Sequence, residues 1–362
     1  MKAIVLLGGQ GTRLRPLTYT TPKQLLPVVE VPMLERVLAQ LRAHGVDEAV
    51  LSLGYRPDAF FAAYPGHQAA GVRLDYAVEP EPLDTAGAIA FAARHAAIDE
   101  TFIVVNGDVL TDLDTTALVA FHRSHGAAAT IHLKAVEDPS RFGVVPIDAD
   151  GRVIEFVEKP PADRVPTNLI NAGTYVLEPS VLALIPLERR VSVEREIFPA
   201  LVADGTVFAM ASEAYWLDTG TPEAYLQANA DLLGGVRPGP PAPDARQVSL
   251  GVWTLGAPVV RGEVLAPSLL GAGAQVAAEA TVTASVLGAR STVEHGARVE
   301  HSVLLPGARV GAGARVSGSI LGHDCVVAEG CELLPVTVVG DDVVVPEGAR
   351  LTDARVPAEM AS

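Results

Sequence analysis

The spacing of apolar residues changes along this chain. Up to residue 233, short β-branched runs such as "AIVLL", "EAVLSL", "VRLDYAV" and "TFIVVNGD" alternate with longer segments whose apolar residues recur at helical spacing. The runs predict strands, and "PMLERVLAQLRAHG", "TAGAIAFAARHAA" and "TTALVAFHRSHG" predict helices that stop near Gly45 and Gly126. Alternating strands and helices predict right-handed crossovers and a Rossmann-like, mostly parallel sheet with helices on both faces. Ligands bind such sheets beyond the carboxyl ends of the strands.

A different pattern follows Asp148. The segments "FGVVPID" and "RVIEFVE" flank the turn sequence "ADG" and predict paired strands, with a further strand at "NAGTYVLEP". We expect this part to form a substrate-facing addition that makes the sheet mixed. A last helix over "TPEAYLQANADLLGG" ends the half, so the sequence predicts an α/β domain over residues 1–233.

A second domain is predicted over residues 251–356, after a Pro/Gly linker at residues 234–250. A hydroxyl residue followed by apolar residues recurs every 17 or 18 positions, at Ser268, Ser285, Ser302, Ser319 and Thr337. Aliphatic residues fall five or six apart, at Leu287, Val293, Val299, Leu304, Val310, Val316 and Leu321. This hexapeptide spacing predicts a left-handed parallel β-helix whose coils stack around one aliphatic column. We expect the column to include Ile320, Cys325, Cys331 and Val338.

Length and charge limit what this protein can be. Its 362 residues suit two domains that each bury an apolar core. A formal net charge of -16 argues against partners such as nucleic acid or an anionic membrane, so an anionic ligand must be small and met by local cations. The apolar start "AIVLL" is too short for a signal peptide or a membrane span. We therefore expect a soluble, cytoplasmic protein.

Cysteine and histidine residues give no sign of a metal centre. The 2 cysteines match neither a disulfide framework nor zinc-ligand spacing. The 9 histidines form no ligand cluster. His122 and His125 are three apart on a predicted helix, and we expect them on its solvated face.

The opening stretch "LLGGQGTRLRPLTYTTPKQLLPV" carries the first chemical signal. It follows a predicted strand and precedes a predicted helix, where glycine-rich backbone can wrap a phosphate with its amides. Gly8, Gly9 and Gly11 allow close approach of the backbone to a ligand, and Arg13 and Lys23 supply positive charge. The stretch lacks the GxGxxG and GK[ST] signatures, so these residues taken alone also fit an ordinary turn.

The combination "GGxGTRLRPLT" with "PKQLLPV" resembles the sugar-nucleotide pyrophosphorylases, the nucleotidyltransferases that join a nucleoside triphosphate to a sugar 1-phosphate. Further segments resemble that family in the same order: "EPEPLDTAGAI" at residues 79–89, "NGDVL", "FVEKP" with "NAGTYV", and "WLDTGTPEAYL". The repeat tail is similar to those of mannose-1-phosphate guanylyltransferases. The resemblance extends along the whole chain and implies that residues 1–233 form a nucleotidyltransferase domain.

The resemblance also implies a set of site residues. For catalysis it implies Arg13, Lys23, Asp108, Lys159 and Asp218, with Asp108 and Asp218 as the ligands of Mg²⁺. For nucleotide binding it adds Leu7, Gly8, Gly9, Gly11, Thr12, Glu79, Glu81, Thr85, Ala86 and Gly87. For the sugar phosphate the candidates are Gly143, Glu158, Lys159, Asn171 and Gly173.

Phosphate chemistry agrees with these roles. An oxygen of the sugar phosphate attacks the α-phosphorus in line with the departing pyrophosphate, and a phosphate needs no general base. Two polyanions must meet, so charge neutralisation and alignment dominate. Arg13 is expected beside the pyrophosphate, Lys23 between phosphates near the reaction centre, and Lys159 on the sugar phosphate. Few carboxylates are expected around Mg²⁺, because phosphate oxygens and water complete its octahedron.

Each residue also has a plainer interpretation. Asp108 can be a turn residue, and Asp218 can cap the helix that follows it. Lys159 can be a solvated strand end. Asp84 stands where relatives usually have glycine; it can cap the next helix, or its carboxylate can alter how ribose or base is held.

Three functions remain open on the sequence. The first is guanylyl transfer from GTP to mannose 1-phosphate, in which Glu79 or Glu81 accepts the N1 and N2 hydrogens of guanine; thymidylyl or uridylyl transfer to glucose 1-phosphate is the nearest alternative. The second is acyl transfer by the β-helix, which holds His295, His301 and His323. The third is a regulatory subunit that binds sugar nucleotides, which the retained charged residues argue against. The open ends of a β-helix favour a homo-oligomer.

Overall fold

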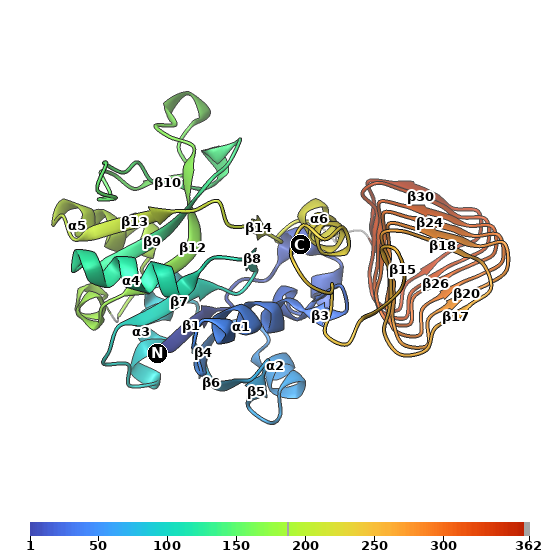
Figure 1. The fold of residues 1–362 in the computed structure, drawn as a ribbon, viewed down its shortest axis with the longest axis horizontal. Coiled ribbons are helices and arrows are strands. Elements are labelled where there is room, and N and C mark those ends of the chain that lie inside the picture. The colour runs from blue at the N-terminus through green and yellow to red at the C-terminus, as the bar shows by residue number, and fades with distance from the viewer. Residues whose placement is uncertain (187, 358–362) are drawn as a thin grey trace. The chain divides into compact units, whose positions relative to one another are not determined.

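The computed structural model describes residues 1–186 and 188–357 of the chain (Figure 1). Backbone contacts divide the chain into two compact units. The first consists of Met1–Gly9 and Leu34–Trp216, and the second of Gln10–Met33 and the residues from Leu217 on. Each unit has an apolar core of its own. The division does not follow chain order, because residues 10–33 belong with the C-terminal part of the chain.

The first unit is built on a mixed sheet of ten strands. Its path runs β11-β10-β12-β7-β1-β4-β6-β5, with β9 paired to β12 and β13 paired to β9. The strands are β1 (Lys2–Leu6), β4 (Glu48–Leu53), β5 (Gln68–Ala69), β6 (Val72–Val78), β7 (Phe102–Asn106), β9 (Ala129–Ala135), β10 (Gly143–Val144), β11 (Val157–Glu158), β12 (Leu169–Leu177) and β13 (Val207–Ala211). The four central strands β7, β1, β4 and β6 are parallel, as predicted, and β10 and β11 form the expected antiparallel pair. Two short strands lie outside this sheet, β8 (Val109–Thr111) and β14 (Trp216–Asp218).

The helices of the first unit are α1 (Met33–Ala43), α2 (Pro57–Ala63), α3 (Asp84–His95), α4 (Thr115–His125) and α5 (Phe198–Ala203), with a π-helical turn at Val193–Ile197. Three of them, α1, α3 and α4, agree with the predicted apolar spacing, and α2 and α5 were not predicted. Gly126 ends α4 in the left-handed conformation, with φ 56°, as its predicted role as a helix stop requires. The core between the helices and the sheet includes Ile4, Val104, Ile131 and Phe198. None of the described helices is long and apolar enough to cross a membrane.

One prediction about α4 is wrong. His122 is 1% exposed, because its face of α4 packs on β9 and not on solvent. One of its ring nitrogens lies 2.8 Å from Thr130 Oγ1 and the other 3.0 Å from Glu178 Oε1. His125 is half-buried and lies over the Phe121 ring. The two histidines therefore serve packing and internal hydrogen bonding.

The second unit contains the predicted left-handed β-helix, in which the chain visits three sheets in turn; their strands are parallel except β15, which pairs antiparallel with β16. The first sheet consists of β15 (Arg246–Ser249), β16 (Val252–Thr254), β19 (Ser268–Leu270), β22 (Val286–Leu287), β25 (Val303–Leu304), β28 (Ile320–Leu321), β31 (Val338–Val339) and β34 (Arg355–Val356). The second consists of β17 (Val259–Val260), β20 (Gln275–Val276), β23 (Thr292–Val293), β26 (Arg309–Val310), β29 (Val326–Val327) and β32 (Val344–Val345). The third consists of β18 (Glu263–Leu265), β21 (Thr281–Thr283), β24 (Arg298–Glu300), β27 (Arg315–Ser317), β30 (Glu332–Leu334) and β33 (Arg350–Thr352). The unit also holds the hairpin β2 (Pro27–Val28) and β3 (Val31–Pro32) and the helix α6 (Pro222–Leu233).

The aliphatic column is as predicted, with one correction. All seven residues of the predicted series lie in the β-helix core, and Cys325 and Cys331 lie there with them, at 0% and 1% exposure. Ile320 and Val338 do not line the column; their neighbours Leu321 and Val339 do. Side chains alternate between the two faces of a strand, so Ile320 and Val338 point out of the coil. Both are nevertheless 0% exposed, so this outer face is covered.

The recurring serines form a ladder of buried hydroxyl groups at one corner of the β-helix. The Ser302 amide donates to Ser285 Oγ at 3.1 Å, and the Ser319 amide donates to Ser302 Oγ at 3.1 Å. Each hydroxyl in turn donates to a carbonyl of its own coil, as Ser285 Oγ does to Thr283 O at 2.7 Å. Because serine recurs every 17 residues, each of these buried hydroxyls lies next to the serine amide of the following coil and accepts a hydrogen bond from it.

Candidate active site

The carboxyl ends of β1 and β7 meet at one edge of the sheet. The Gly107 amide donates to the Leu6 carbonyl at 3.0 Å. A Cβ on Gly107 would lie 2.3 Å from Leu7 Cδ2, so only glycine allows the two strand ends to approach this closely. The half-buried Asp108 follows directly, at the edge where Gly8 and Gly9 leave β1. The predicted residues Leu7, Gly8, Gly9 and Asp108 thus occur at the carboxyl ends of adjacent parallel strands, where α/β sheets bind ligands.

A bulge in β12 positions two further candidates. The register of β12 against β9 shifts between Asn171 and Tyr175, and such bulges redirect side chains near active sites. Within the bulge, Asn171 Oδ1 accepts from the Gly173 amide at 3.0 Å, and Asn171 Nδ2 donates to Tyr175 Oη at 2.8 Å. Gly173 has φ 75°, and a Cβ there would lie 2.5 Å from Asn106 Nδ2. Asn171 and Gly173 therefore lie beside the end of β7.

The pair β10 and β11 presents the expected sugar-phosphate residues. Gly143 pairs with Glu158 across the two strands, and a Cβ on Gly143 would lie 3.0 Å from Glu158 Oε2. Lys159 Nζ lies 3.3 Å from Glu158 Oε1, and the lysine side chain is 60% exposed. The Lys159 backbone has φ 49°, a conformation that is costly for a residue with a Cβ. The hydrogen bond from the Lys159 amide to the Phe142 carbonyl, at 3.0 Å, holds this conformation. The backbone that carries the exposed ammonium group is therefore fixed in place.

The loop after β6 is held together by Glu79. Its Oε1 accepts from Ser52 Oγ at 3.2 Å and its Oε2 accepts from the Leu83 amide at 3.0 Å. Glu81 is exposed. Asp84 has φ 62°, and its Oδ1 accepts from the Thr85 amide at 2.9 Å, whereas the N-cap position of α3 is Leu83. Glycine is the usual residue in this backbone conformation, and aspartate is among the residues that tolerate it best.

The first turn of α3 is tied to the segment that follows residue 190. The amides of Ala86 and Gly87 donate to the Val191 carbonyl at 2.9 and 3.2 Å. Thr85 Oγ1 donates to Glu194 Oε2 at 2.6 Å and accepts from the Val193 amide at 2.9 Å. The three predicted residues of this turn are thus engaged within the chain, and their part in nucleotide binding stays a prediction.

Glu194 is a residue that the sequence analysis did not single out. It lies in the π-helical turn Val193–Ile197, and such turns occur frequently at functional sites. Burial, and then the nearby Glu194 carboxylate, raise the pKa of Tyr175, so this hydroxyl stays protonated where it meets Asn171. The segment "SVEREIF", which contains Glu194, gives no periodic or motif signal that would single out this residue.

The second unit carries the remaining candidates. Gly11 adopts φ 62° at the start of a 3-10 turn over Thr12–Leu14, and a Cβ there would lie 2.9 Å from Thr18 and 3.2 Å from Lys23. The turn places Thr12 and Arg13 on the surface and Lys23 beside Gly11.

Arg13 and Asp218 meet over Gly220, although 205 positions separate them in the chain. A Cβ on Gly220 would lie 2.5 Å from Arg13 Nη2 and 2.9 Å from Asp218 Oδ1. Asp218 Oδ1 accepts from the Gly220 amide at 2.8 Å, and the following helix is capped by Thr221 and not by Asp218. A guanidinium and a carboxylate are therefore held over the same glycine.

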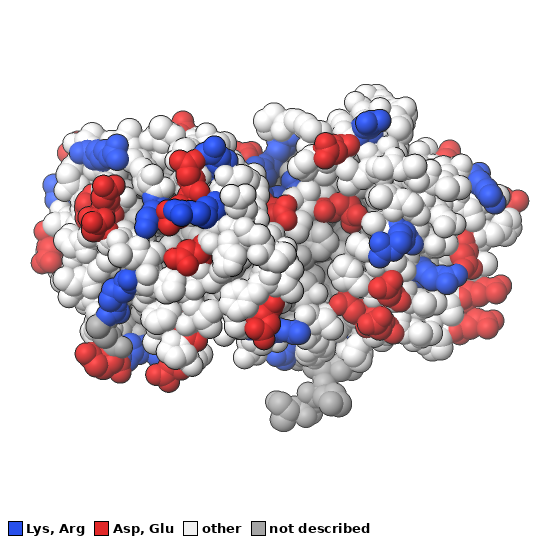
Figure 2. Space-filling view, turned by 90° about the horizontal axis from the view of Figure 1, so that it is seen from below, with Lys and Arg blue, Asp and Glu red and all other residues white. Residues whose placement is uncertain are grey.

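Charge and ligand type limit what these residues can hold. Among the described residues no group of three or more His, Cys, Asp or Glu side chains is arranged to bind a metal ion by itself. Asp108 and Asp218 offer hard oxygen donors of the kind that magnesium prefers when phosphate oxygens supply the other ligands. On the face shown in Figure 2, acidic and basic side chains are interspersed, without one continuous basic patch.

Comparison with known proteins places the chain. Residues 2–234 match the family "Nucleotidyl transferase", and residues 264–359 match the family "GMPPB C-terminal domain". The chain is 42% identical over 277 residues to the mannose-1-phosphate guanylyltransferase of Mycobacterium tuberculosis, which covers 73% of this chain and 76% of that protein. It is 40% identical over 243 residues to the mannose-1-phosphate guanylyltransferase catalytic subunit beta of Dictyostelium discoideum, covering 66% of each chain.

A solved structure agrees. The crystal structure of HddC from Yersinia pseudotuberculosis complexed with GMP-PN is 32% identical, with a TM-score of 0.55, and covers 63% of this chain and 97% of its own. The two family matches agree with the structure. The first covers the sheet and the glycine-rich opening loop, and the second covers most of the β-helix. The chain belongs to the nucleotidyl transferase family.

Proposed function

We propose that this protein is a mannose-1-phosphate guanylyltransferase, which converts GTP and mannose 1-phosphate to GDP-mannose and pyrophosphate. The observation that carries the proposal is the match of both parts of the chain, the nucleotidyl transferase match in the first and the GMPPB C-terminal domain match in the second. Relatives named for this activity, at 40 and 42% identity, support it. HddC, the similar solved protein with GMP-PN, supports a guanine nucleotide as the donor.

The reaction needs positive charge more than it needs proton transfer. A phosphate oxygen of the sugar attacks the α-phosphorus of GTP, a new P–O bond forms, and the bond to the β-phosphate breaks to release pyrophosphate. The nucleophile is already an anion, so no general base is required. Arg13 and Lys23 neutralise the triphosphate and the pyrophosphate that leaves, and the glycines at positions 8, 9 and 11 admit the phosphates to the backbone amides.

The nucleotidyl transferase family generally uses a divalent metal ion, and we propose that this ion is Mg²⁺. Asp108 and Asp218 would hold it, because carboxylate oxygens fit its preference for hard donors. The ion supplies stabilisation of the charge that develops on the phosphate oxygens. Among the protein groups, Asp218 is oriented for this role by the bond from the Gly220 amide.

On the acceptor side, Lys159 holds the phosphate of mannose 1-phosphate with its exposed ammonium group. Glu158 and Asn171 accept and donate hydrogen bonds to the sugar hydroxyls. Gly143 and Gly173 lack a Cβ, which lets Glu158 and Asn106 pack closely against them. Each residue is held by contacts within its own strand pair or bulge, which keeps the pocket ordered before substrate arrives.

For the base, the geometry separates the two candidate carboxylates. Glu79 is engaged with Ser52 and the Leu83 amide and keeps the loop in shape. We assign the acceptor of the guanine N1 and N2 hydrogens to Glu81, which is exposed two residues later. Asp84 stands where relatives usually have glycine, and its left-handed backbone conformation is one that both residue types adopt. The aspartate therefore carries no argument for a different base.

A substrate panel tests the proposed function. The full-length protein is incubated with GTP, dTTP or UTP and with mannose 1-phosphate or glucose 1-phosphate, and pyrophosphate release is measured with Mg²⁺ and with a chelator. We expect the highest kcat/KM for GTP with mannose 1-phosphate and loss of turnover with the chelator. A preference for dTTP or UTP with glucose 1-phosphate contradicts the proposal.

We also propose that the protein forms a homo-oligomer through the first coil of the β-helix. Apolar side chains are exposed there, with Leu250 at 90%, Val248 at 63%, Val259 at 49% and Val260 at 45%. The strands β17 and β18 are sheet edges at this end, and open edges favour pairing. Light scattering of the wild type and of Val259→Asp checks this, with a lower mass expected for the variant.

The two buried free cysteines suit the reducing cytoplasm, which we propose as the location.

A further inference from the structure

One outer face of the β-helix differs from the other two. On the five strands β19, β22, β25, β28 and β31 of the first sheet, the outward positions are apolar and 0 to 3% exposed, namely Leu269, Val286, Val303, Ile320 and Val338. On the other two sheets the outward positions include exposed polar and charged side chains such as Arg298, Arg309 and Arg315. An aliphatic row outside the column adds nothing to the stacking of coils, so this face is built to be covered.

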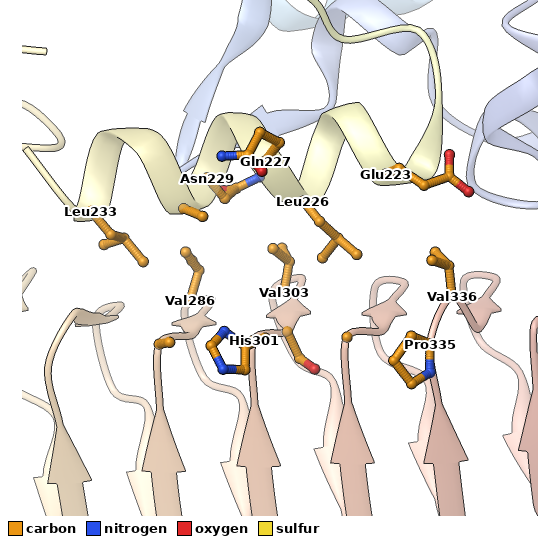
Figure 3. Close-up of a pocket in the computed structure, with 14 residues that line it drawn as sticks. Glu223, Leu226, Gln227, Asn229, Leu233, Val286, His301, Val303, Pro335 and Val336 are labelled. Atoms are coloured by element: carbon orange, nitrogen blue, oxygen red, sulfur yellow. The ribbon is translucent and has the colours of Figure 1, made fainter. Parts of the chain in front are cut away.

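The helix α6 covers part of this face. Figure 3 shows Leu226 and Leu233 of α6 pointing toward Val286 and Val303 of the β-helix. A cavity of about 290 Å³ remains between the helix and the coils. The helix begins at Pro222, four positions after Asp218, so a residue proposed for catalysis lies close in the chain to an element packed on the β-helix.

The segment 10–33, which carries Arg13 and Lys23, makes two polar contacts with corners of the β-helix. Glu30 Oε2 accepts from the Ala289 amide at 2.9 Å. The Thr20 hydroxyl bonds to the Asp341 carboxylate, whose other oxygen accepts from the His323 amide at 2.7 Å. The partners of these contacts are 259 and 321 positions apart in the chain.

The tip of the hairpin that holds Glu30 depends on such contacts. Val28 pairs with Val31, so Val29 and Glu30 form a two-residue turn, with φ 47° and 61°. Asn-Gly or Asp-Gly is the usual sequence for this turn, and a β-branched residue at positive φ is strained. The Val29 amide donates to Asn229 Oδ1 of α6 at 2.7 Å, and Glu30 reaches the β-helix. Tertiary contacts at both residues therefore hold a turn that its own sequence disfavours.

We propose that Glu30 and Thr20 are positioning residues for nucleotide binding. They tie the segment 10–33 to two corners of the β-helix, and with it they set the place of the Arg13 guanidinium and the Lys23 ammonium. The β-helix is thereby a working part of the triphosphate site and not only a surface for assembly. The inference rests on the proposed function for the roles of Arg13 and Lys23.

Kinetics provide the first test. In Glu30→Ala the Ala289 amide loses its acceptor, and we expect the KM for GTP to rise on the order of tenfold with a smaller change in kcat. Glu30→Gln retains an acceptor oxygen and is expected to restore the wild-type KM, as is Thr20→Ser where Thr20→Val raises it. Glu294→Ala is the matched control, because Glu294 is a β-helix carboxylate paired with Arg309 at 3.4 Å, and its KM should not change.

Hydrogen exchange provides a second test that needs no substrate. In Glu30→Ala we expect the amides of residues 11–26 to exchange on the order of tenfold faster, while the amides of the β-helix keep their rates. Unchanged exchange and unchanged KM overturn the inference, and so does a general increase throughout the β-helix, which signifies a merely structural role. Failure of the wild type to use GTP overturns the proposed function, whereas the exchange pattern still reports on the docking of the segment.

Discussion

The mixed sheet and the β-helix both bury apolar strands, but they end those strands differently. The parallel strands of the sheet run into loops that each differ from the others, such as Gly8 and Gly9 after β1 and Asp108 after β7. The strands of the β-helix run into corners that repeat, where serine hydroxyls satisfy the same amide in successive coils. The residues proposed for the chemistry thus lie where the pattern of the chain is broken, and a continuous aliphatic core lies where it is repeated.

Buried polar groups show the same contrast. The sheet unit buries His132 with one ring nitrogen bonded to Ser212 Oγ at 2.8 Å and no partner for Nδ1. Burial, and then the charge on Lys134, lower the pKa of His132 to about 4. The β-helix instead buries hydroxyls, which carry no charge between acid and neutral pH. We therefore expect pH to affect the stability of the sheet unit more than that of the repeats.

The largest effect is expected at a strand end of the sheet. Asp108→Asn removes a proposed metal ligand without changing the shape of the side chain, and kcat should fall about a thousandfold. The midpoint of thermal unfolding should stay within about 2 °C of the wild type, because no core contact is lost. Pyrophosphate release and circular dichroism measure the two quantities. Asp150→Asn, in the exposed turn "ADG", is the control; near-normal turnover of Asp108→Asn removes Asp108 from the metal site.

The second prediction concerns the repeated column. Leu304 is 0% exposed in the β-helix core, so Leu304→Ala should lower the free energy of unfolding by about 3 kcal/mol without a direct effect on kcat. Val344 is 65% exposed, and Val344→Ala should change it by less than about 0.5 kcal/mol. Urea titration measures both. Equal effects of the two substitutions would show that the column is not the source of stability.

The third prediction is the acid sensitivity of the sheet. His132 binds protons less readily in the folded state than in the unfolded state, where its pKa is near 6.5, so unfolding gains protons between pH 6.5 and 4. The free energy of unfolding should therefore fall with falling pH in this window, by up to about 3 kcal/mol from this residue. His132→Gln should remove that part of the slope, measured by urea titration at several pH values. A parallel slope in wild type and variant contradicts the assignment.

The smallest effect is expected at the contact between the hairpin and the β-helix. Burial raises the pKa of Glu30, against the bond from the Ala289 amide and the charge on Arg290. A raised folded-state pKa means that stability is lost as pH rises from the unfolded value of 4.5 through the folded value. Glu30→Gln keeps the acceptor and should abolish this loss, so the variant should be slightly more stable than the wild type at pH 7 in thermal unfolding. A variant less stable than the wild type at pH 7 would show that the charge itself is needed.

Much of the fold could be predicted because its signals are local. The apolar spacing predicted α1, α3, α4 and α6 and the central strands, and the 17-residue period predicted the β-helix and its column. The predictions that failed concern which side of an element is covered. Ile320 and Val338 were predicted in the column, and His122 on a solvated face, because the apolar spacing within one element does not show what packs against its other face.

The candidate site divides in the same way. Arg13, Lys23, Asp108, Lys159 and Asp218 were chosen from motifs, and their roles stay predictions until the variants are measured. The motifs did not show that Arg13 and Asp218 meet over Gly220, or that Glu79 and Thr85 are engaged in holding their own loops. Such facts depend on pairs of residues from distant segments, and each segment alone looks the same whether or not its partner is near.

The sequence by itself thus determined the kinds of element, their order, the repeat and the residue types available for phosphate chemistry, because periodicity and turn preference act over a few residues. Only the tertiary structure decided that residues 10–33 pack with the β-helix, that an apolar row outside the column is covered by α6, and that a strained Val-Glu turn is held from two sides. The physical reason is that these contacts join groups far apart in the chain, and more than 190 positions apart for the hydrogen bonds of Val29, Glu30 and Thr20. Their free energy comes from burial and hydrogen bonds that exist only after the whole chain has folded.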